Sequence, residues 1–421
     1  MAATRSLRRY DIVLVGAIGY TGTIAAEHIA NYLPTNLRWA VAGRSSTKLE
    51  SLCSRLSTIN PDRLRPDIEI VSVDNETSLR NLVKQARVCL SVVSYTTAGH
   101  FVISACIEEQ TDYVDTSGGA VLLRRWIDKY QEKAVANGVK LVLSCGMLSG
   151  LFDLVALATI QGLSEKHSLD TEELILCDIE VPVEISGGTA HTIEVMQLED
   201  SQAVKESADP WHLCPRRQGA DYHAKKLTNG IGLRRDPVLG LLSDSTVGGD
   251  GNRQIVNWTW ALLSDPDQGV KEKKGYGPTF QYNEYSKVSS TLDGLFRKLS
   301  STILLLLMSL KIGAMLVRLF APPPGEGPDT EKSRRLPVKL EAHAIAAPQS
   351  NGTSPRVRTT FSYMGGPYII TGMLLAEGAA SLLYNHEELH SFAGFITPAI
   401  LGKDLLQRVQ TAGASIEISD V

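Results

Sequence analysis

The sequence predicts an α/β protein with a doubly wound parallel sheet and a second, α+β domain that contains an antiparallel sheet. Three observations support this class. Up to about residue 165, six short β-branched apolar runs alternate with stretches of helical length, a rhythm typical of βαβ units. A glycine-rich turn follows the first apolar run. After about residue 170 the alternation stops and the chain becomes richer in Gly, Pro, Asp and Trp.

The first domain is expected over residues 1–165 and should have the Rossmann-type arrangement. Its predicted strands cover residues 11–17, 38–43, 68–74, 88–94, 112–117 and 139–146. Helices are predicted between and after them, over residues 21–33, 47–56, 78–86, 99–109, 121–137 and 151–164. Six such strands in one region favour a single doubly wound sheet.

The second domain is expected over residues 166–365. Residues 174–184 read as a strand, and residues 255–263 alternate as a half-buried strand does. Two further strand-like runs, 336–347 and 356–363, are joined by the turn-rich residues 348–355, which predicts a hairpin with a long loop. Residues 366–421 are expected to form C-terminal helices, over 367–384 and 399–411, that return to the first domain or its interface.

Residues 303–320 are almost continuously apolar, and three readings of this segment remain open. Its length approaches that of a membrane span. Lys311 and Arg318 disfavour spanning, because each cation near the centre of a spanning helix costs about 2.5–3.5 kcal/mol. Together with Arg297 they lie at multiples of seven residues, near one helical stripe, which suits an interfacial helix on a membrane or lipid-droplet surface. The third reading is a buried helix or an interface in a homo-oligomer.

Composition excludes several classes of function. The chain has 421 residues, and its 42 Lys and Arg nearly balance 46 Asp and Glu, so it lacks the basic face that non-specific nucleic-acid binding needs. Six scattered cysteines show no metal-ligand spacing and fit a reducing, cytoplasmic setting. The N-terminus carries no apolar signal region. Hydrolase and metalloenzyme motifs are absent from the sequence, so no metal is expected.

The strongest chemical signal is the run Gly16-Ala17-Ile18-Gly19-Tyr20-Thr21-Gly22, placed between the first predicted strand and the first helix. In a dinucleotide-binding turn of this kind, the first glycine makes the tight turn and the second lets the backbone approach the pyrophosphate. The third lets the helix pack against the sheet. The phosphates would bind the N–H groups at the helix N-terminus. We therefore predict a nucleotide site formed by Gly16, Ile18, Gly19, Tyr20, Thr21 and Gly22.

Residues after the second predicted strand indicate which nucleotide binds. An NAD site usually has Asp or Glu there, to hold the ribose 2′-hydroxyl. This chain has Arg44 and Ser45, with Lys48 one turn later. A guanidinium suits a 2′-phosphate through charge-assisted hydrogen bonds. The predicted cofactor is NADPH.

Several motifs resemble those of the saccharopine dehydrogenase-like oxidoreductases. They are GAIGYTG and AGRSSTKL within residues 11–49, and Tyr113–Gly118, Ser144–Gly146, Ser186–Thr189, Pro324–Pro328 and Phe395–Ala399. The chain looks most similar to the branch called trans-acting enoyl reductases. This resemblance implies a Rossmann domain, a second α/β domain, an NADP cofactor and a lipid-associated setting, with a polyketide synthase as a partner that carries the substrate.

The chain departs from the family pattern at three places. Ser94-Tyr95-Thr96 replaces a Gly-Pro-Tyr run, Gly119 stands where relatives often have Glu, and Leu148-Ser149-Gly150-Leu151 replaces Asp-Ser-x-Pro. All three follow predicted strands, where doubly wound folds bind ligands. The substrate, and even the activity, can therefore differ from those of relatives.

Five residues are candidates for the reaction centre. Tyr95 could donate a proton or bind the nicotinamide ribose, beside Ser94 in the predicted cofactor site. Asp115 could act as an acid or base, or cap the next helix. His191 is the histidine best placed to titrate near neutral pH. Cys145 should lie near the nicotinamide, although a buried, inert thiol is the commoner case.

Three hypotheses of function follow. The first is an NADPH-dependent reductase of a polyketide- or lipid-derived unsaturated substrate. The second is an imine or keto reductase that uses the same fold on another electrophile. The third is a protein of a lipid surface whose nucleotide site is vestigial.

Overall fold

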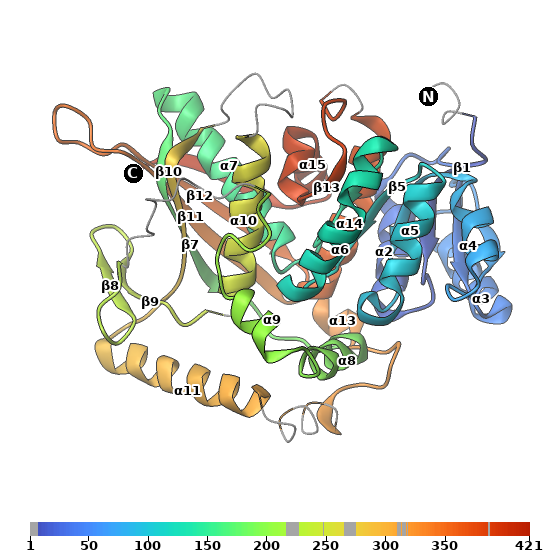
Figure 1. The fold of residues 1–421 in the computed structure, drawn as a ribbon, viewed down its shortest axis with the longest axis horizontal. Coiled ribbons are helices and arrows are strands. Elements are labelled where there is room, and N and C mark those ends of the chain that lie inside the picture. The colour runs from blue at the N-terminus through green and yellow to red at the C-terminus, as the bar shows by residue number, and fades with distance from the viewer. Residues whose placement is uncertain are drawn as a thin grey trace.

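The computed structural model describes residues 7–215, 227–246, 248–264, 275–309, 319–385 and 388–421, together with Gly313 and Val317. Its first sheet has seven parallel strands in the order β13-β6-β5-β4-β1-β2-β3 (Figure 1). The strands are β1 (Tyr10–Val15), β2 (Trp39–Gly43), β3 (Asp67–Ile70), β4 (Ala86–Ser91), β5 (Asp112–Asp115), β6 (Lys140–Val142) and β13 (Gly394–Ile396). The order reverses between β1 and β4, which is where such sheets bind their ligands.

The helices of this region follow the predicted pattern closely. They are α2 (Tyr20–Tyr32), α3 (Ser46–Ile59), α4 (Glu76–Val83), α5 (His100–Glu108), α6 (Ala120–Ala136) and α7 (Gly150–His167). Local chemistry explains two of the starts: Ser45 caps α3 and Asn75 caps α4, each accepting a hydrogen bond from a backbone N–H of the first turn. The predicted α/β class with a doubly wound parallel sheet is confirmed.

The second sheet also has seven strands, in the order β14-β12-β11-β7-β10-β9-β8. They are β7 (Thr171–Glu180), β8 (Leu233–Asp236), β9 (Gly240–Ser243), β10 (Tyr276–Lys287), β11 (Pro337–Ala346), β12 (Arg356–Met364) and β14 (Ser415–Asp420). The hairpin of β11 and β12 is the predicted one. Since β10 runs parallel to β7 while the other neighbours are antiparallel, the sheet is mixed rather than purely antiparallel.

The predicted strand over residues 255–263 is wrong. These residues belong to the helix α10 (Gly249–Leu263). The alternation misleads because polar side chains of α10 are buried with partners rather than exposed. Asn257 donates from Nδ2 to the carbonyl of Pro210 (2.9 Å), and the hydroxyl of Thr259 donates to Oδ1 of Asp153 (2.7 Å). A helix buried on several faces loses the polar stripe by which a surface helix is recognised.

The C-terminal residues contribute to both sheets. The predicted helix α14 (Pro367–Tyr384) packs on α2, where Nε2 of His28 lies 2.8 Å from Oε1 of Glu377. Strand β13 then extends the first sheet, α15 (Gly402–Thr411) follows, and β14 pairs with β12 in the second sheet. Neither β13 nor β14 was predicted, because three and six residues at the edges of sheets carry little periodicity of their own.

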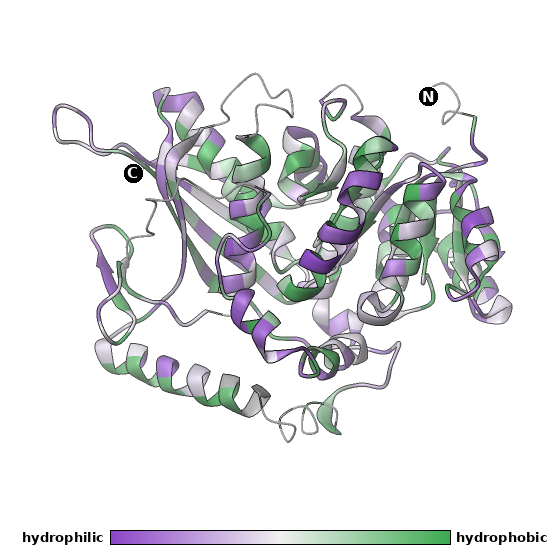
Figure 2. Ribbon diagram, in the orientation of Figure 1, coloured by the Kyte–Doolittle hydropathy of each residue, from purple (hydrophilic) through white to green (hydrophobic). Residues whose placement is uncertain are grey.

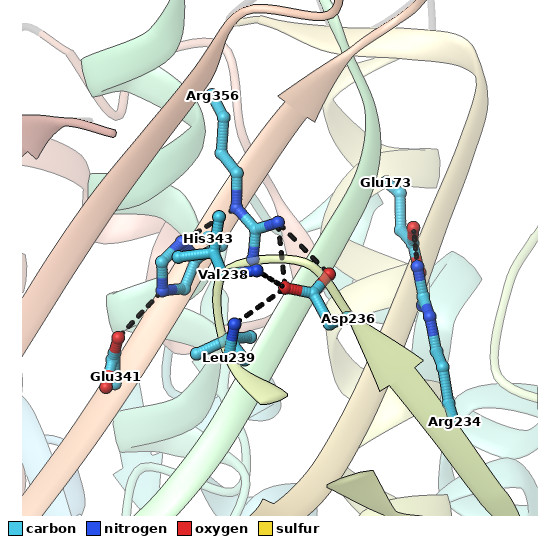
Figure 3. Close-up of polar contacts among 8 residues, drawn as sticks. All are labelled: Glu173, Arg234, Asp236, Val238, Leu239, Glu341, His343 and Arg356. Carbon is cyan, nitrogen blue, oxygen red and sulfur yellow. Dashed lines mark hydrogen bonds and ion pairs between the residues drawn. The ribbon is translucent and has the colours of Figure 1, made fainter. Parts of the chain in front are cut away.

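The hairpin of β8 and β9 lies across the outer face of the second sheet (Figure 3). Asp236 at its turn accepts hydrogen bonds from two backbone N–H groups of the turn and pairs with Arg356 of β12 at 3.0 Å. Nε of Arg356 donates to Nδ1 of His343 (2.9 Å), whose Nε2 lies 2.8 Å from Glu341. Glu341 in turn forms an ion pair with Lys287, whose Nζ lies 2.6 Å from its Oε2. This buried polar network fastens the hairpin to the sheet.

The apolar segment 303–320 lies only partly within the described residues. Residues 303–309 form the end of α11 (Thr291–Ser309), and most of residues 310–318 fall outside the description. Figure 1 shows α11 lying apart from the two sheets, beside β9. Among the described helices, none is both long and apolar enough to cross a bilayer.

Candidate functional site

The turn between β1 and α2 has the backbone geometry of a nucleotide-binding loop. Gly16 has a φ of +87°, a left-handed conformation that side chains rarely adopt. A Cβ on Gly22 would lie 2.3 Å from the carbonyl oxygen of Gly16, which is impossible without moving the backbone. Both glycines are therefore required by the fold of the turn.

The N-terminus of α2 offers donors to an anion. Gly19 precedes the helix and has no capping side chain. The N–H groups of Tyr20, Thr21 and Gly22 come too early in the helix to reach a carbonyl of an earlier turn. Together with the helix dipole, they form a site that favours a phosphate group. Ile18 packs on Gly43 at the end of β2, so its side chain supports the turn.

The residues after β2 form an exposed basic rim next to this turn. Arg44 and Lys48 are both exposed, while the hydroxyl of Ser45 accepts the N–H of Lys48 at 3.4 Å. A hydrogen bond from Ser72 and the nearby charge of Arg44 lower the pKa of Asp74. An exposed guanidinium at this position could hold the 2′-phosphate of NADPH through charge-assisted hydrogen bonds, so these residues fit that cofactor.

Elements of the second domain cover this turn. The ring of Tyr20 meets that of Tyr368 edge-on, with centroids 5.1 Å apart, and Gly327 packs directly on the Tyr20 ring. The N–H of Gly187 donates to the carbonyl of Glu326 (3.0 Å). The two motifs Ser186–Thr189 and Pro324–Pro328, far apart in sequence, therefore meet above the predicted phosphate site.

Tyr368 is a residue that the sequence analysis missed. Its hydroxyl accepts the N–H of Ser186 (2.8 Å) and lies 2.6 Å from the hydroxyl of Thr189. These contacts fix the start of α8 (Gly187–Met196) against α14. The one sequence signal was the Gly-Pro start of α14, which predicts a helix boundary but not a contact with residues 180 positions away.

Tyr95 and Ser94 lie where β4 ends, in the region where the strand order reverses. Tyr95 opens a short π-helical turn, η1 (Tyr95–Gly99), a feature frequent at functional sites. Its hydroxyl lies beside Thr192 of α8, and burial raises the pKa of Tyr95 to about 12, so the phenol stays protonated. Ser94 accepts the hydroxyl of Thr97 (2.9 Å) and caps the turn.

The side chains of Asp115 and Cys145 are buried and form hydrogen bonds inside the protein. Asp115 accepts hydrogen bonds from the hydroxyl of Tyr113 (2.8 Å) and from the N–H and hydroxyl of Ser117 (2.9 and 2.7 Å). Burial raises the pKa of Asp115 to about 6, although these donors oppose the shift. The Cys145 thiol donates to the carbonyl of Leu374 (3.3 Å), and burial raises its pKa strongly. Both side chains brace the strand ends of the site.

His191 belongs to α8, the helix that faces the carboxyl ends of β4 and β5 across the domain boundary. Thr192 of this helix reaches Tyr95, and Met196 reaches Gly119. His191 itself is 41% exposed, with Nδ1 4.0 Å from a carboxylate oxygen of Glu194. The structure thus brings the glycine turn, Tyr95, Asp115 and Cys145 to one edge of the first sheet. His191 lies on α8, the helix that contacts this edge through Thr192 and Met196.

Comparisons with known proteins agree with this geometry. Residues 12–142 match the family described as saccharopine dehydrogenase NADP binding domain. Over 431 residues, 96% of this chain and 97% of the other, the sequence is 27% identical to the trans-acting enoyl reductase of Mycobacterium tuberculosis strain H37Rv. It is 25% identical over 434 residues to the trans-acting enoyl reductase of Mycobacterium ulcerans, covering 97% of each chain.

A structural relative supports the fold assignment. Apo saccharopine dehydrogenase (L-Glu forming) from Saccharomyces cerevisiae matches with a TM-score of 0.52 and 13% identity, covering 98% of this chain and all of that one. The resemblance deduced from the motifs is therefore confirmed, as are NADP(H) as the cofactor and the class of NADPH-dependent oxidoreductase.

Proposed function

We propose that this protein is a trans-acting enoyl reductase, which reduces the carbon–carbon double bond of a polyketide- or lipid-derived thioester in a biosynthetic pathway. The observation that carries the proposal is the shared carboxyl edge of the first sheet, which holds the glycine turn, Arg44 and the protonated phenol of Tyr95, with Tyr95 beside Thr192 of α8. The full-length similarity to proteins of that name supports it. A polyketide synthase would be the partner that presents the substrate.

Each of these residues has a role in the proposed reduction. NADPH supplies a hydride to the β-carbon when it is bound. The N–H groups of Tyr20, Thr21 and Gly22 hold its pyrophosphate, and Arg44 holds its 2′-phosphate. Tyr95 donates a hydrogen bond to the thioester oxygen, where negative charge develops in the transition state.

The α-carbon must then receive a proton. His191, a partly exposed residue of α8, is our candidate for delivering this proton from solvent. Asp115 acts through Ser117, because its carboxyl fixes the backbone that follows β5. Ser94 lies at the nicotinamide end, whereas the buried Cys145 thiol supports the end of the sheet from behind and exchanges no proton.

The test is a panel of three substrates with NADPH: an enoyl thioester, a β-keto thioester and a cyclic imine. The proposal expects turnover of the enoyl thioester, and a loss of about 100-fold in kcat for Tyr95→Phe, the size of losing one oxyanion donor. Tyr32→Phe, which removes an exposed phenol outside the site, serves as the control. Turnover of the imine or ketone alone would favour the alternative, a saccharopine-type reductase. Absence of NADPH binding would favour a protein with a vestigial nucleotide site.

A second proposal concerns location: the protein is cytoplasmic and binds a lipid surface peripherally through α11. Figure 2 shows apolar residues along this outlying helix. They recur at helical spacing and are strongly exposed: Leu292 78%, Leu295 47%, Phe296 71%, Leu299 58%, Ile303 48% and Leu306 61%. Such an exposed apolar stripe is typical of interfacial helices and of interfaces between proteins.

The competing reading of α11 is contact between two copies of this chain. Flotation with vesicles or artificial lipid droplets, combined with light scattering of the free protein, separates the two readings. Binding to lipid by a monomer supports the peripheral helix. A stable dimer that ignores lipid supports the oligomer interface.

A further inference from the structure

Two carboxyl groups of the second sheet lie on the face that packs against α10 and α7. Asp178 of β7 and Glu284 of β10 come from adjacent parallel strands, where Asp178 pairs with Ser286, two residues from Glu284. Side chains two residues apart share a face of a strand. Glu284 is 3% exposed, and no described feature of the nucleotide site uses it.

Both hydrogen bonds of the Glu284 carboxyl go to the same oxygen atom. Its Oε2 accepts Nδ2 of Asn252 (2.9 Å) and the hydroxyl of Tyr282 (2.8 Å). Within the part of the chain that the structure describes, Oε1 of Glu284 and Oδ1 of Asp178 are buried without a well-placed hydrogen-bond partner, although Thr246 lies close to Glu284. Burial raises the pKa of Glu284 to about 7 and that of Asp178 to about 6. A buried oxygen that lacks a donor favours the neutral acid.

Asn252 connects this carboxyl to the loop after β6. Its Oδ1 accepts the N–H of Ser149 (2.8 Å) and lies 3.2 Å from the Ser149 hydroxyl. Ser149 has a φ of +66° and Ser144, at the other end of the loop, a φ of +58°. Two non-glycine residues in the left-handed region mark a strained segment that its surroundings must hold in place.

The held loop belongs to the reaction edge of the first sheet. It begins where β6 ends, beside Cys145, and Ser144 ties it to the carbonyl of Ser117 at 2.7 Å. Leu148 within it is 48% exposed and lies against Gly248, at the start of α10. The loop is therefore exposed at the boundary between the two domains, where the substrate of the proposed reduction would enter.

We propose that Glu284 is a positioning residue: it holds Asn252, Asn252 holds the strained Ser149, and the buried neutral acid favours the closed loop at residues 146–149 over an open loop in which water reaches Glu284. The effect on catalysis rests on the proposed function. The hydrogen-exchange test of the loop does not depend on that function. The proton matters because, in the closed state, an ionised Glu284 would be a buried charge near Asp178 whose Oε1 has no hydrogen-bond donor among the described residues.

The sign of the pH effect follows from the surroundings of Glu284. The charged and titratable groups around Glu284 and Asp178 are Tyr282 and Arg297, and Arg253 and Asp153 lie near Tyr282. None of these donates to Oε1, and the donors Asn252 and Tyr282 on Oε2, with Thr246 nearby, offset the cost of burying an ionised Glu284 only in part. The closed loop therefore loses stability as the pH rises from 4.5, the ordinary pKa of a glutamate, through about 7, the pKa of the buried Glu284, and above that range the effect is complete.

Hydrogen–deuterium exchange of the segment around Ser149 tests this directly, because that amide donates to Asn252. Corrected for intrinsic rates, protection in the wild type should fall about tenfold as the pH rises from about 6 to about 8, the tenfold change corresponding to about 1.4 kcal/mol. Glu284→Gln, neutral at every pH, should keep protection constant. Glu180→Gln, an exposed acid on the neighbouring strand, is the control and should behave as the wild type.

Two outcomes decide the matter. Equal pH dependence in the wild type and Glu284→Gln overturns the proposal, and so does unchanged protection in Asn252→Leu, which removes the acceptor of Ser149. If the protein reduces a substrate, the decline of kcat as the pH rises toward about 7 should disappear in Glu284→Gln, while KM for NADPH stays unchanged. Failure to find any substrate would count against the proposed function and leave the exchange result standing.

Discussion

Gly19 and Gly22 lie three residues apart in the nucleotide turn, and the structure assigns them different tasks. Replacing Gly22 by Ala puts a Cβ 2.3 Å from the carbonyl oxygen of Gly16 and 3.0 Å from two backbone atoms of Ala17. The first contact is about 1 Å shorter than van der Waals distance, and all three neighbours are backbone that cannot rotate away. Forcing α2 off the turn should cost about 1–3 kcal/mol of unfolding free energy, the usual price of overpacking.

Gly19→Ala is the matched comparison. Its Cβ would lie 3.4 Å from the same oxygen, an ordinary contact, so stability should change by about 0.5 kcal/mol or less. The methyl group nevertheless occupies the surface that the pyrophosphate approaches, and NADPH affinity should fall by about tenfold or more, which is about 1.4 kcal/mol. Urea unfolding measures the first quantity and NADPH fluorescence titration the second. If Gly22→Ala unfolds at the wild-type urea concentration, or Gly19→Ala binds NADPH normally, the reading of this turn is refuted.

Four further predictions follow from other contacts. Arg44→Ala should weaken NADPH binding by about tenfold or more while NADH binding changes little, since only NADPH carries the 2′-phosphate. Asp153→Asn should flatten the pH dependence of stability. Burial raises the pKa of Asp153 from 3.8 to about 7, so the folded wild type binds this proton more tightly and loses unfolding free energy as the pH rises between these values. Arg356→Met should destabilise the protein by about 3–5 kcal/mol in urea unfolding, because it leaves a buried carboxylate unpaired. Phe296→Ser combined with Leu299→Ser should release the protein from lipid vesicles in a flotation assay.

A particular result would contradict each of these four predictions. Equal losses of NADPH and NADH binding would mean that Arg44 does not contact the 2′-phosphate. A steep pH dependence retained without Asp153 would place the responsible proton elsewhere. Stability unchanged in the Arg356 variant would show that the hairpin of β8 and β9 is held by its apolar contacts alone. For α11, the control is Leu64→Ser with Ile70→Ser, two comparably exposed positions in the first domain, which should leave flotation unchanged.

The first sheet could be predicted because its signals are local. Each strand of a parallel sheet is a short apolar run, each crossover helix has its own periodicity, and the glycine turn is contiguous. The predicted nucleotide site depends on residues within about thirty positions of one another, from Gly16 to Lys48. Nothing distant in the chain was needed to find it.

The rest of the site depends on contacts that no local pattern encodes. Tyr368 meets Ser186 across 182 positions, and Asn252 meets Ser149 across 103. The helix α10 was mistaken for a strand because its buried polar side chains imitate alternation. Asp115 illustrates a further limit: its position at a strand end was predictable, whereas its burial under Tyr113 and Ser117 was not.

The central claim is that this edge of the first sheet transfers hydride from NADPH to the β-carbon of an enoyl thioester. The most direct measurement is single-turnover reduction of a short enoyl thioester with NADPH that carries two deuterium atoms at C4 of the nicotinamide, followed by mass spectrometry and NMR of the product. The account predicts one deuterium at the β-carbon and a solvent-derived proton at the α-carbon. Deuterium at a carbonyl or imine carbon, or none in any product, would contradict it.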